Sequence, residues 1–222
     1  MAQSVQRSST LKPTKAYLRF ESVAQRSLDL LTLQAATVKI WQLAQPQRSI
    51  DLSDMGRASV VLAVAAMDSY FTDVFVERLV PFIKRKGATK RLVELLHDAG
   101  VDTECALQLI VMKSPFRKIT KMVEVHLSLV TTQKSDAIDR LFLGYGLKDF
   151  CGNVARFSKK GLRLLSSIQT LVNRRHRIVH EGDLNSHGRP NRTDPKEFVR
   201  RIHDVVLFVS KADEILNNQL WK

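Results

Sequence analysis

Apolar residues recur at steps of three and four between residues 164 and 179, and this spacing constrains the fold more than any other feature of the chain. Because an α-helix advances about 100° per residue, these side chains form one stripe along a helix. Arg175 lies near the centre of that stripe, whereas Arg177 lies on the opposite face, where a solvated arginine is expected. We therefore expect Arg175 to be at least partly buried and paired with a carboxylate. The stripe consists of Leu164, Leu165, Ile168, Leu171, Val172, Ile178 and Val179.

The whole chain carries the same helical signal, with 44% hydrophobic residues but only 9 glycines and 6 prolines among 222 residues. This composition favours a largely helical protein that buries a substantial core. We predict an all-α fold, an up-and-down helical bundle with an inserted set of shorter helices. A flexible N-terminus, residues 1–14, precedes a single domain, residues 15–222, in which the inserted helices occupy 88–158. The predicted helices cover residues 15–44, 53–86, 88–98, 103–126, 136–143, 147–157, 160–180 and 195–219.

Two of these helices carry specific local signals. Pro81 lies inside the second helix and is expected to kink or break it, because proline cannot donate a backbone hydrogen bond. The last helix has the signature of a capping box, with Asp194 as cap, Pro195 in the first position and Glu197 three residues after the cap. We therefore expect the last helix to begin at Pro195.

The formal net charge of +13 favours a polyanionic partner, nucleic acid before others. The basic residues cluster, since no acidic residue occurs between Asp149 and Glu181. The alternative is that they are only a solvated helix face. The nucleic-acid-binding residues that we predict from this cluster are Lys159, Lys160, Arg163, Arg174 and Arg177.

The acid-free segment ends in the run Arg175-His176-Arg177-Ile178-Val179-His180, which resembles the Arg-polar-x-x-x-His motif of the HEPN superfamily. The stretch from Asn173 to Asp183 is most similar to the branch called RiboL-PSP-HEPN. A second, weaker resemblance covers residues 60–71, similar to the helix that packs beside the motif. The resemblance implies an all-helical bundle, usually a homodimer, and often a metal-independent ribonuclease. Residues 88–158 resemble nothing that we can name.

The motif residues suit RNA cleavage by the ribose 2′-OH. A histidine can act as base or acid near neutral pH, and arginine is a permanently charged, forked donor to phosphate. Carried over residue by residue, Arg175 and His180 are the catalytic residues and His176 a supporting one. Arg175 and His180 lie about 140° apart around a regular helix, so we expect the helix to loosen near Val179. Asp68, at the edge of the second helix's apolar stripe, is predicted to pair with Arg175; the alternative is that it faces solvent.

Other functions remain open at this stage. His176 and His180 have the spacing of two metal ligands on a helix, but the zincin glutamate is missing, and we expect neither a metal nor a cofactor. The strongest alternative is a non-catalytic HEPN-like module that binds RNA, a nucleotide or a partner protein. Glu181 follows the motif, so the His-x-Tyr extension through which some toxin relatives are controlled is absent.

Two cysteines far apart, Cys105 and Cys151, predict a reduced intracellular protein. The polar N-terminus and the short apolar runs predict a cytoplasmic protein without a membrane span. By resemblance alone, the setting is toxin-antitoxin or anti-phage defence, with RNA, a second copy of the chain and an antitoxin or defence protein as partners.

Overall fold

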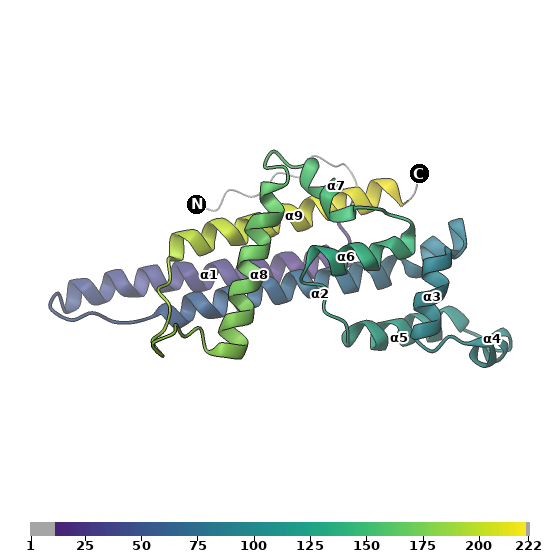
Figure 1. The fold of residues 1–222 in the computed structure, drawn as a ribbon, viewed down its shortest axis with the longest axis horizontal. Coiled ribbons are helices and arrows are strands. Elements are labelled where there is room, and N and C mark those ends of the chain that lie inside the picture. Colours follow the sequence, from purple (N-terminus) through teal and green to yellow (C-terminus); the bar gives the residue numbers. More distant parts are fainter. Residues whose placement is uncertain (1–11, 221–222) are drawn as a thin grey trace.

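The computed structural model describes residues 12–220, and this part of the chain is all-helical, as predicted. It holds nine α-helices, one 3-10 turn and no strand among the described residues. The elements are α1 Lys15–Ala44, α2 Ser53–Lys86, α3 Lys90–Asp98, α4 Thr103–Ile110, α5 Pro115–Ser128, α6 Ser135–Phe142, η1 Leu143–Tyr145, α7 Phe150–Arg156, α8 Arg163–Glu181 and α9 Pro195–Gln219. Figure 1 shows α1, α2 and α9 running along the molecule, α8 crossing over them, and α3 to α5 gathered at one end.

α1 and α2 form a long antiparallel hairpin whose bounds agree with the predicted ranges (Figure 1). Thr14 caps α1, since its hydroxyl oxygen accepts the N–H of Tyr17 at 3.0 Å. Thr14 is itself buried, and its hydroxyl donates to Asp213 of α9. Residues 1–11 of the predicted flexible N-terminus lie outside the described residues. Thr14, the last residue of that predicted segment, is buried and hydrogen-bonded, so it belongs to the folded domain. α2 runs through Pro81 without a break.

The core is an aromatic cluster that joins α2 to the shorter helices. The ring of Phe71 packs edge-on against Phe142 and Phe150, with ring centroids 6.0 and 6.5 Å apart, and Phe75 stacks on Tyr145 at 4.4 Å. Such pairs contribute about 0.5–1.5 kcal/mol each beyond the burial of their area. Because three of these rings come from α6, η1 and α7, the segment 88–158 shares its core with the long helices.

α8 differs from the predicted helix in two respects. It begins at Arg163 and not at residue 160, because Gly161 has a φ of 54° and cannot be part of a right-handed helix. It continues without interruption to Glu181, so the predicted loosening near Val179 is wrong. Gly182, with a φ of 62°, ends the helix in the left-handed conformation that glycine adopts without strain.

α9 begins as predicted, with Asp194 as its cap and Pro195 in its first position. The side chain of Asp194 accepts the N–H of Lys196 at 2.9 Å. The carboxylate of Glu197 binds Arg201 one turn along the helix. The predicted capping box is therefore only half formed, because Glu197 is held by a side chain and not by the backbone.

α2 is also long and apolar enough to cross a membrane, contrary to the prediction that the apolar runs are too short. More than half of its most apolar stretch is buried inside the bundle, where α1, α5, α8 and α9 pack against it. A helix that is apolar around most of its circumference is typical of a protein core. The burial of α2 thus accounts for its composition.

Candidate active site

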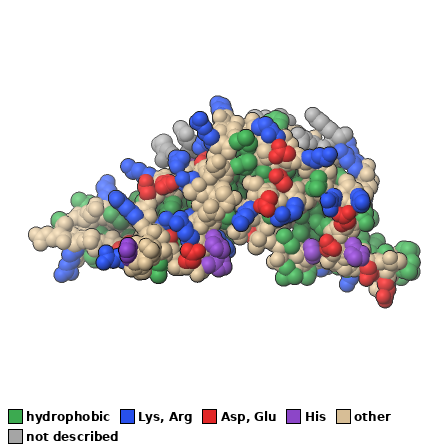
Figure 2. Space-filling model, in the orientation of Figure 1, with side chains coloured by type: hydrophobic (Ala, Val, Ile, Leu, Met, Phe, Trp, Pro, Cys, Tyr) green, Lys and Arg blue, Asp and Glu red, His purple; other side chains and the backbone are tan. Residues whose placement is uncertain are grey.

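A groove of about 900 Å³ lies between the C-terminal half of α8 and the segment that joins α5 to α6. Arg175, His176, Arg177 and His180 all line it, so the groove brings the whole motif to one surface. The opposite wall comes from residues 131–140. In Figure 2, histidine side chains gather at the lower end of α8, next to an indentation in the outline of the molecule.

Arg175 is partly buried, which confirms the expectation from the stripe. Its Nε atom is fully buried and has no hydrogen-bond partner among the described residues. A buried guanidinium nitrogen without a protein acceptor is costly. Arg175 therefore lines the groove while its buried Nε has no acceptor among the described residues.

The predicted pairing of Asp68 with Arg175 is wrong, because Asp68 has other partners among the described residues. The Asp68 carboxylate accepts the backbone N–H and the hydroxyl of Thr132, at 2.6 and 2.7 Å, and the amide of Gln133 at 2.8 Å. These three donors come from the loop between α5 and α6. Asp68 thus fixes the wall opposite the motif and leaves Arg175 free of a carboxylate.

Arg174, the neighbour of Arg175, does form a buried ion pair, and it shares its partner with Arg57. Its guanidinium donates to Asp183 at 2.6 Å, and Arg57 of α2 donates to the same carboxylate oxygen at 2.9 Å. Asp183 is completely buried. Burial acts to lower the pKa of Arg57, but hydrogen bonds and charges from Asp183 and Asp54 outweigh it and raise this pKa. This network fixes the chain directly after the motif to α2.

His176 and His180 lie one turn apart on α8 with their rings 4.5 Å apart, centroid to centroid. Both residues are exposed, and neither ring has a hydrogen-bond partner within residues 12–220. An exposed imidazole near a permanent cation is suited to proton transfer at a phosphate. In the described chain no group of three or more His, Cys, Asp or Glu side chains is arranged to hold a metal ion, so the two histidines have no third ligand.

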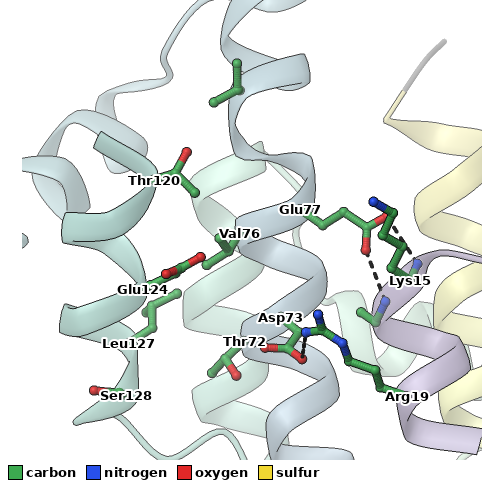
Figure 3. A pocket seen from close by; sticks show the side chains of 12 residues that line it. Lys15, Arg19, Thr72, Asp73, Val76, Glu77, Thr120, Glu124, Leu127 and Ser128 are labelled. Atoms are coloured by element: carbon green, nitrogen blue, oxygen red, sulfur yellow. Dashed lines mark hydrogen bonds and ion pairs between the residues drawn. The ribbon is translucent and has the colours of Figure 1, made fainter. Parts of the chain in front are cut away.

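A second cavity, about 640 Å³, lies between the start of α1, α2 and α5 (Figure 3), and two of its carboxylates, those of Asp73 and Glu77, are bound by α1. Glu77 accepts the N–H groups of Lys15 and Ala16 in the first turn of α1, at 3.3 and 3.1 Å. Arg19 pairs with Asp73, as Figure 3 shows. A carboxylate at a helix N-terminus stabilises the helix. The carboxylates of Asp73 and Glu77 in this cavity therefore hold α1 against α2, a structural role.

The comparison with protein families gives one match, to the family described as RiboL-PSP-HEPN, over residues 39–218. The chain belongs to the RiboL-PSP-HEPN family. The comparisons with curated proteins and with solved structures give no match. The matched region contains the motif, and it also contains residues 88–158, which resembled nothing by sequence alone.

The basic residues predicted to bind nucleic acid do not form one surface of this HEPN protein. Arg177 lines the groove, but Arg174 is held by Asp183. Lys160 forms an ion pair with the buried Asp204. Lys159 and Arg163 are exposed but lie at the other end of α8, where Arg163 is about 20 Å from Arg177 at 1.5 Å per residue.

Two groups of residues at the HEPN site escaped the sequence analysis. Gln133, Lys134 and Arg140 line the groove opposite the motif, and Arg57 and Asp183 form the buried network behind it. The position of Asp183 directly after the motif was the only local signal. The other contacts join residues more than 60 positions apart, which periodicity does not reveal.

Proposed function

We propose that this HEPN protein is a metal-independent endoribonuclease, with Arg175 and His180 as its catalytic residues and His176 in support. The observation that carries the proposal is the groove itself. It holds a partly buried arginine with an unpartnered donor and an exposed histidine, with no carboxylate bound to the arginine. The family, whose members are often ribonucleases, supports the same reaction class.

The reaction needs two proton transfers and one charge to stabilise. A base removes the proton of the ribose 2′-OH, the 2′ oxygen attacks the adjacent phosphorus, and the bond from phosphorus to the 5′ oxygen breaks. An acid protonates the leaving 5′ oxygen, which yields a 2′,3′-cyclic phosphate and a 5′-hydroxyl. His180 acts as base or acid, and Arg175 binds the phosphate oxygens, whose negative charge grows in the transition state.

One protomer contributes one motif, whereas the reaction uses both a base and an acid. A two-fold arrangement of two chains brings two histidines and two arginines to one groove. The proposal therefore includes a homodimer. It places the protein in the cytoplasm, in toxin-antitoxin or anti-phage defence, with an antitoxin or other defence protein as regulator.

The test is to incubate purified protein with end-labelled RNA in EDTA and to analyse the product ends. We expect cleavage that leaves 2′,3′-cyclic phosphates. His180→Ala and Arg175→Ala each lower the rate about a hundredfold or more, since each removes one catalytic effect. The helical circular dichroism spectrum stays unchanged.

Arg200→Ala, which changes an exposed arginine of α9 outside the groove, serves as the control and keeps wild-type activity. Full activity of both motif variants removes the catalytic assignment. Cleavage that requires added divalent metal points to a different mechanism. RNA binding without cleavage points to the non-catalytic module.

A further inference from the structure

The groove has a second wall, residues 131–140, which the motif does not supply. Asp68 holds the start of this wall through Thr132 and Gln133, and Thr132 is completely buried. Since a carboxylate only accepts hydrogen bonds, Gln133 presents its NH₂ group to Asp68. The wall is thus anchored to α2, the same helix whose Arg57 anchors the end of the motif helix.

The exposed side chains of this wall add positive charge opposite the motif. Lys134 is exposed and forms no ion pair with any described residue. Arg140 pairs with Asp136 at 3.3 Å, but both side chains are largely exposed, so solvent screens the pair. Among the residues that line the groove, Lys134, Arg140, Arg175 and Arg177 stand against a single acid, Asp136. An anion in the groove therefore has cations on both sides.

The size of the groove limits the anion. A volume of about 900 Å³ lies within the range of about 300–1,000 Å³ typical of small-molecule sites. An RNA duplex does not enter such a space, whereas a few unstacked nucleotides of a single strand do. Because both walls carry cations, one strand can present successive phosphates to the two walls, whereas a lone phosphate needs only one wall.

We propose that residues 131–140 form the second half of a site for single-stranded RNA, in which Lys134 binds a phosphate next to the one held by Arg175. This inference rests on the proposed function and deepens it, since it names the substrate class and assigns a role to the inserted helices. Asp68 is a positioning residue of this wall.

The test measures binding apart from cleavage. A short, fluorescent 2′-O-methyl RNA has no free 2′-OH and is not cleaved, and its Kd is measured by anisotropy in EDTA over a range of salt concentrations. Lys134→Ala raises the Kd about tenfold and lowers the slope of log Kd against log salt by about 0.7, the value for one phosphate contact on a single strand. The matched control is Lys118→Ala, an exposed lysine of α5 outside the groove.

A duplex of the same sequence is expected to bind at least about tenfold more weakly than the single strand, since it cannot enter the groove. Equal Kd values and salt slopes for Lys134→Ala and Lys118→Ala overturn the inference. So does a duplex that binds as tightly as the single strand, or a wild-type protein that binds no oligonucleotide.

Failure of the inference and failure of the proposed function are distinguishable. If binding depends on Lys134 but no cleavage depends on His180, the nuclease proposal fails and the binding site stands. If cleavage requires Arg175 and His180 while Lys134→Ala binds like the control, the reverse holds. Where both stand, Lys134→Ala raises KM and leaves kcat nearly unchanged, because the residue touches a phosphate that does not react.

Discussion

Asp183 is a completely buried carboxylate that two arginines bind. Its carboxylate is shared by Arg57 and Arg174, and its φ is 57°, a left-handed conformation that asparagine tolerates and most residues do not. Asp183→Asn therefore removes the charge and keeps the backbone. Breaking a buried ion pair by removing one partner typically costs about 3–5 kcal/mol. We expect a loss of that size in the free energy of unfolding, measured by urea denaturation.

The control for this substitution is Asp54→Asn, which removes the other carboxylate bound to Arg57. The side chain of Asp54 is 94% exposed, so its pair is screened by solvent. We expect a loss of less than about 1 kcal/mol. Equal effects of the two substitutions would show that the network behind the motif contributes no more than a surface pair.

The arginine prediction shows what a sequence reveals at this scale. The stripe placed Arg175 on a buried face, and the structure confirms its partial burial. The stripe did not reveal the partner, because consecutive helix residues differ by about 100° and only Arg174 faces Asp183. The position of Asp68 on its own helix made it a candidate partner for Arg175. Its hydrogen-bond donors come instead from a loop 64 and 65 positions further along the chain. Periodicity therefore predicts burial and leaves the partners of a buried charge undetermined.

At the scale of elements, local signals predicted the long helices well. The ranges of α1 and α2 are confirmed, since Thr14 caps the start of the first helix and Gly87, with a φ of 76°, caps the end of the second. α8 begins later than predicted because Gly161 adopts a left-handed backbone conformation, with a φ of 54°. The sequence did not predict the wall at residues 131–140, because its polar loop is held in place by hydrogen bonds to Asp68 of α2, which no local pattern reveals.

The C-terminal end of α8 allows a prediction about how a helix end affects the site. Gly182→Ala forces alanine into a left-handed backbone at φ 62°, two residues after His180, and the added methyl group meets only Leu184, at 3.8 Å. Gly188→Ala imposes the same strain at φ 69°, in the following loop. Each substitution is expected to cost about 1 kcal/mol of unfolding free energy.

Only Gly182→Ala is expected to lower the rate of RNA cleavage as well, because it shifts the turn that carries His180. Urea denaturation and single-turnover cleavage of the two variants, measured side by side, separate strain from positioning. Equal cleavage rates for the two variants would mean that His180 does not depend on how α8 ends.

At the scale of the whole molecule, the proposed homodimer requires an interface that lies close to the motif. Val179 and Leu184 lie on either side of His180 and Gly182, and each is 47% exposed. If the two-fold axis of the proposed dimer passes beside the motif, these two side chains become covered by the second chain. In a two-fold dimer each contact occurs twice, so a change in one residue acts twice.

We expect the wild-type protein to have twice the mass of one chain in light scattering and to lose specific activity on dilution as the dimer dissociates. Leu184→Glu places a charge in each half of the interface. The substitution loses the burial of a leucine, which contributes about 1.5–3 kcal/mol, and adds the cost of burying a carboxylate, so it weakens association. The variant is expected to be monomeric and to cleave RNA more than about tenfold more slowly, while its helical content is retained. Leu33→Glu changes a somewhat more exposed leucine on α1, 55% against 47%, far along the chain from the motif, and should leave mass and activity unchanged. A Leu184→Glu protein that stays dimeric and active would show that Leu184 is not part of the interface. A wild-type protein that cleaves RNA as a monomer would place the second proton-transfer group within one chain. His176, whose ring lies 4.5 Å from that of His180, is then the imidazole that supplies it.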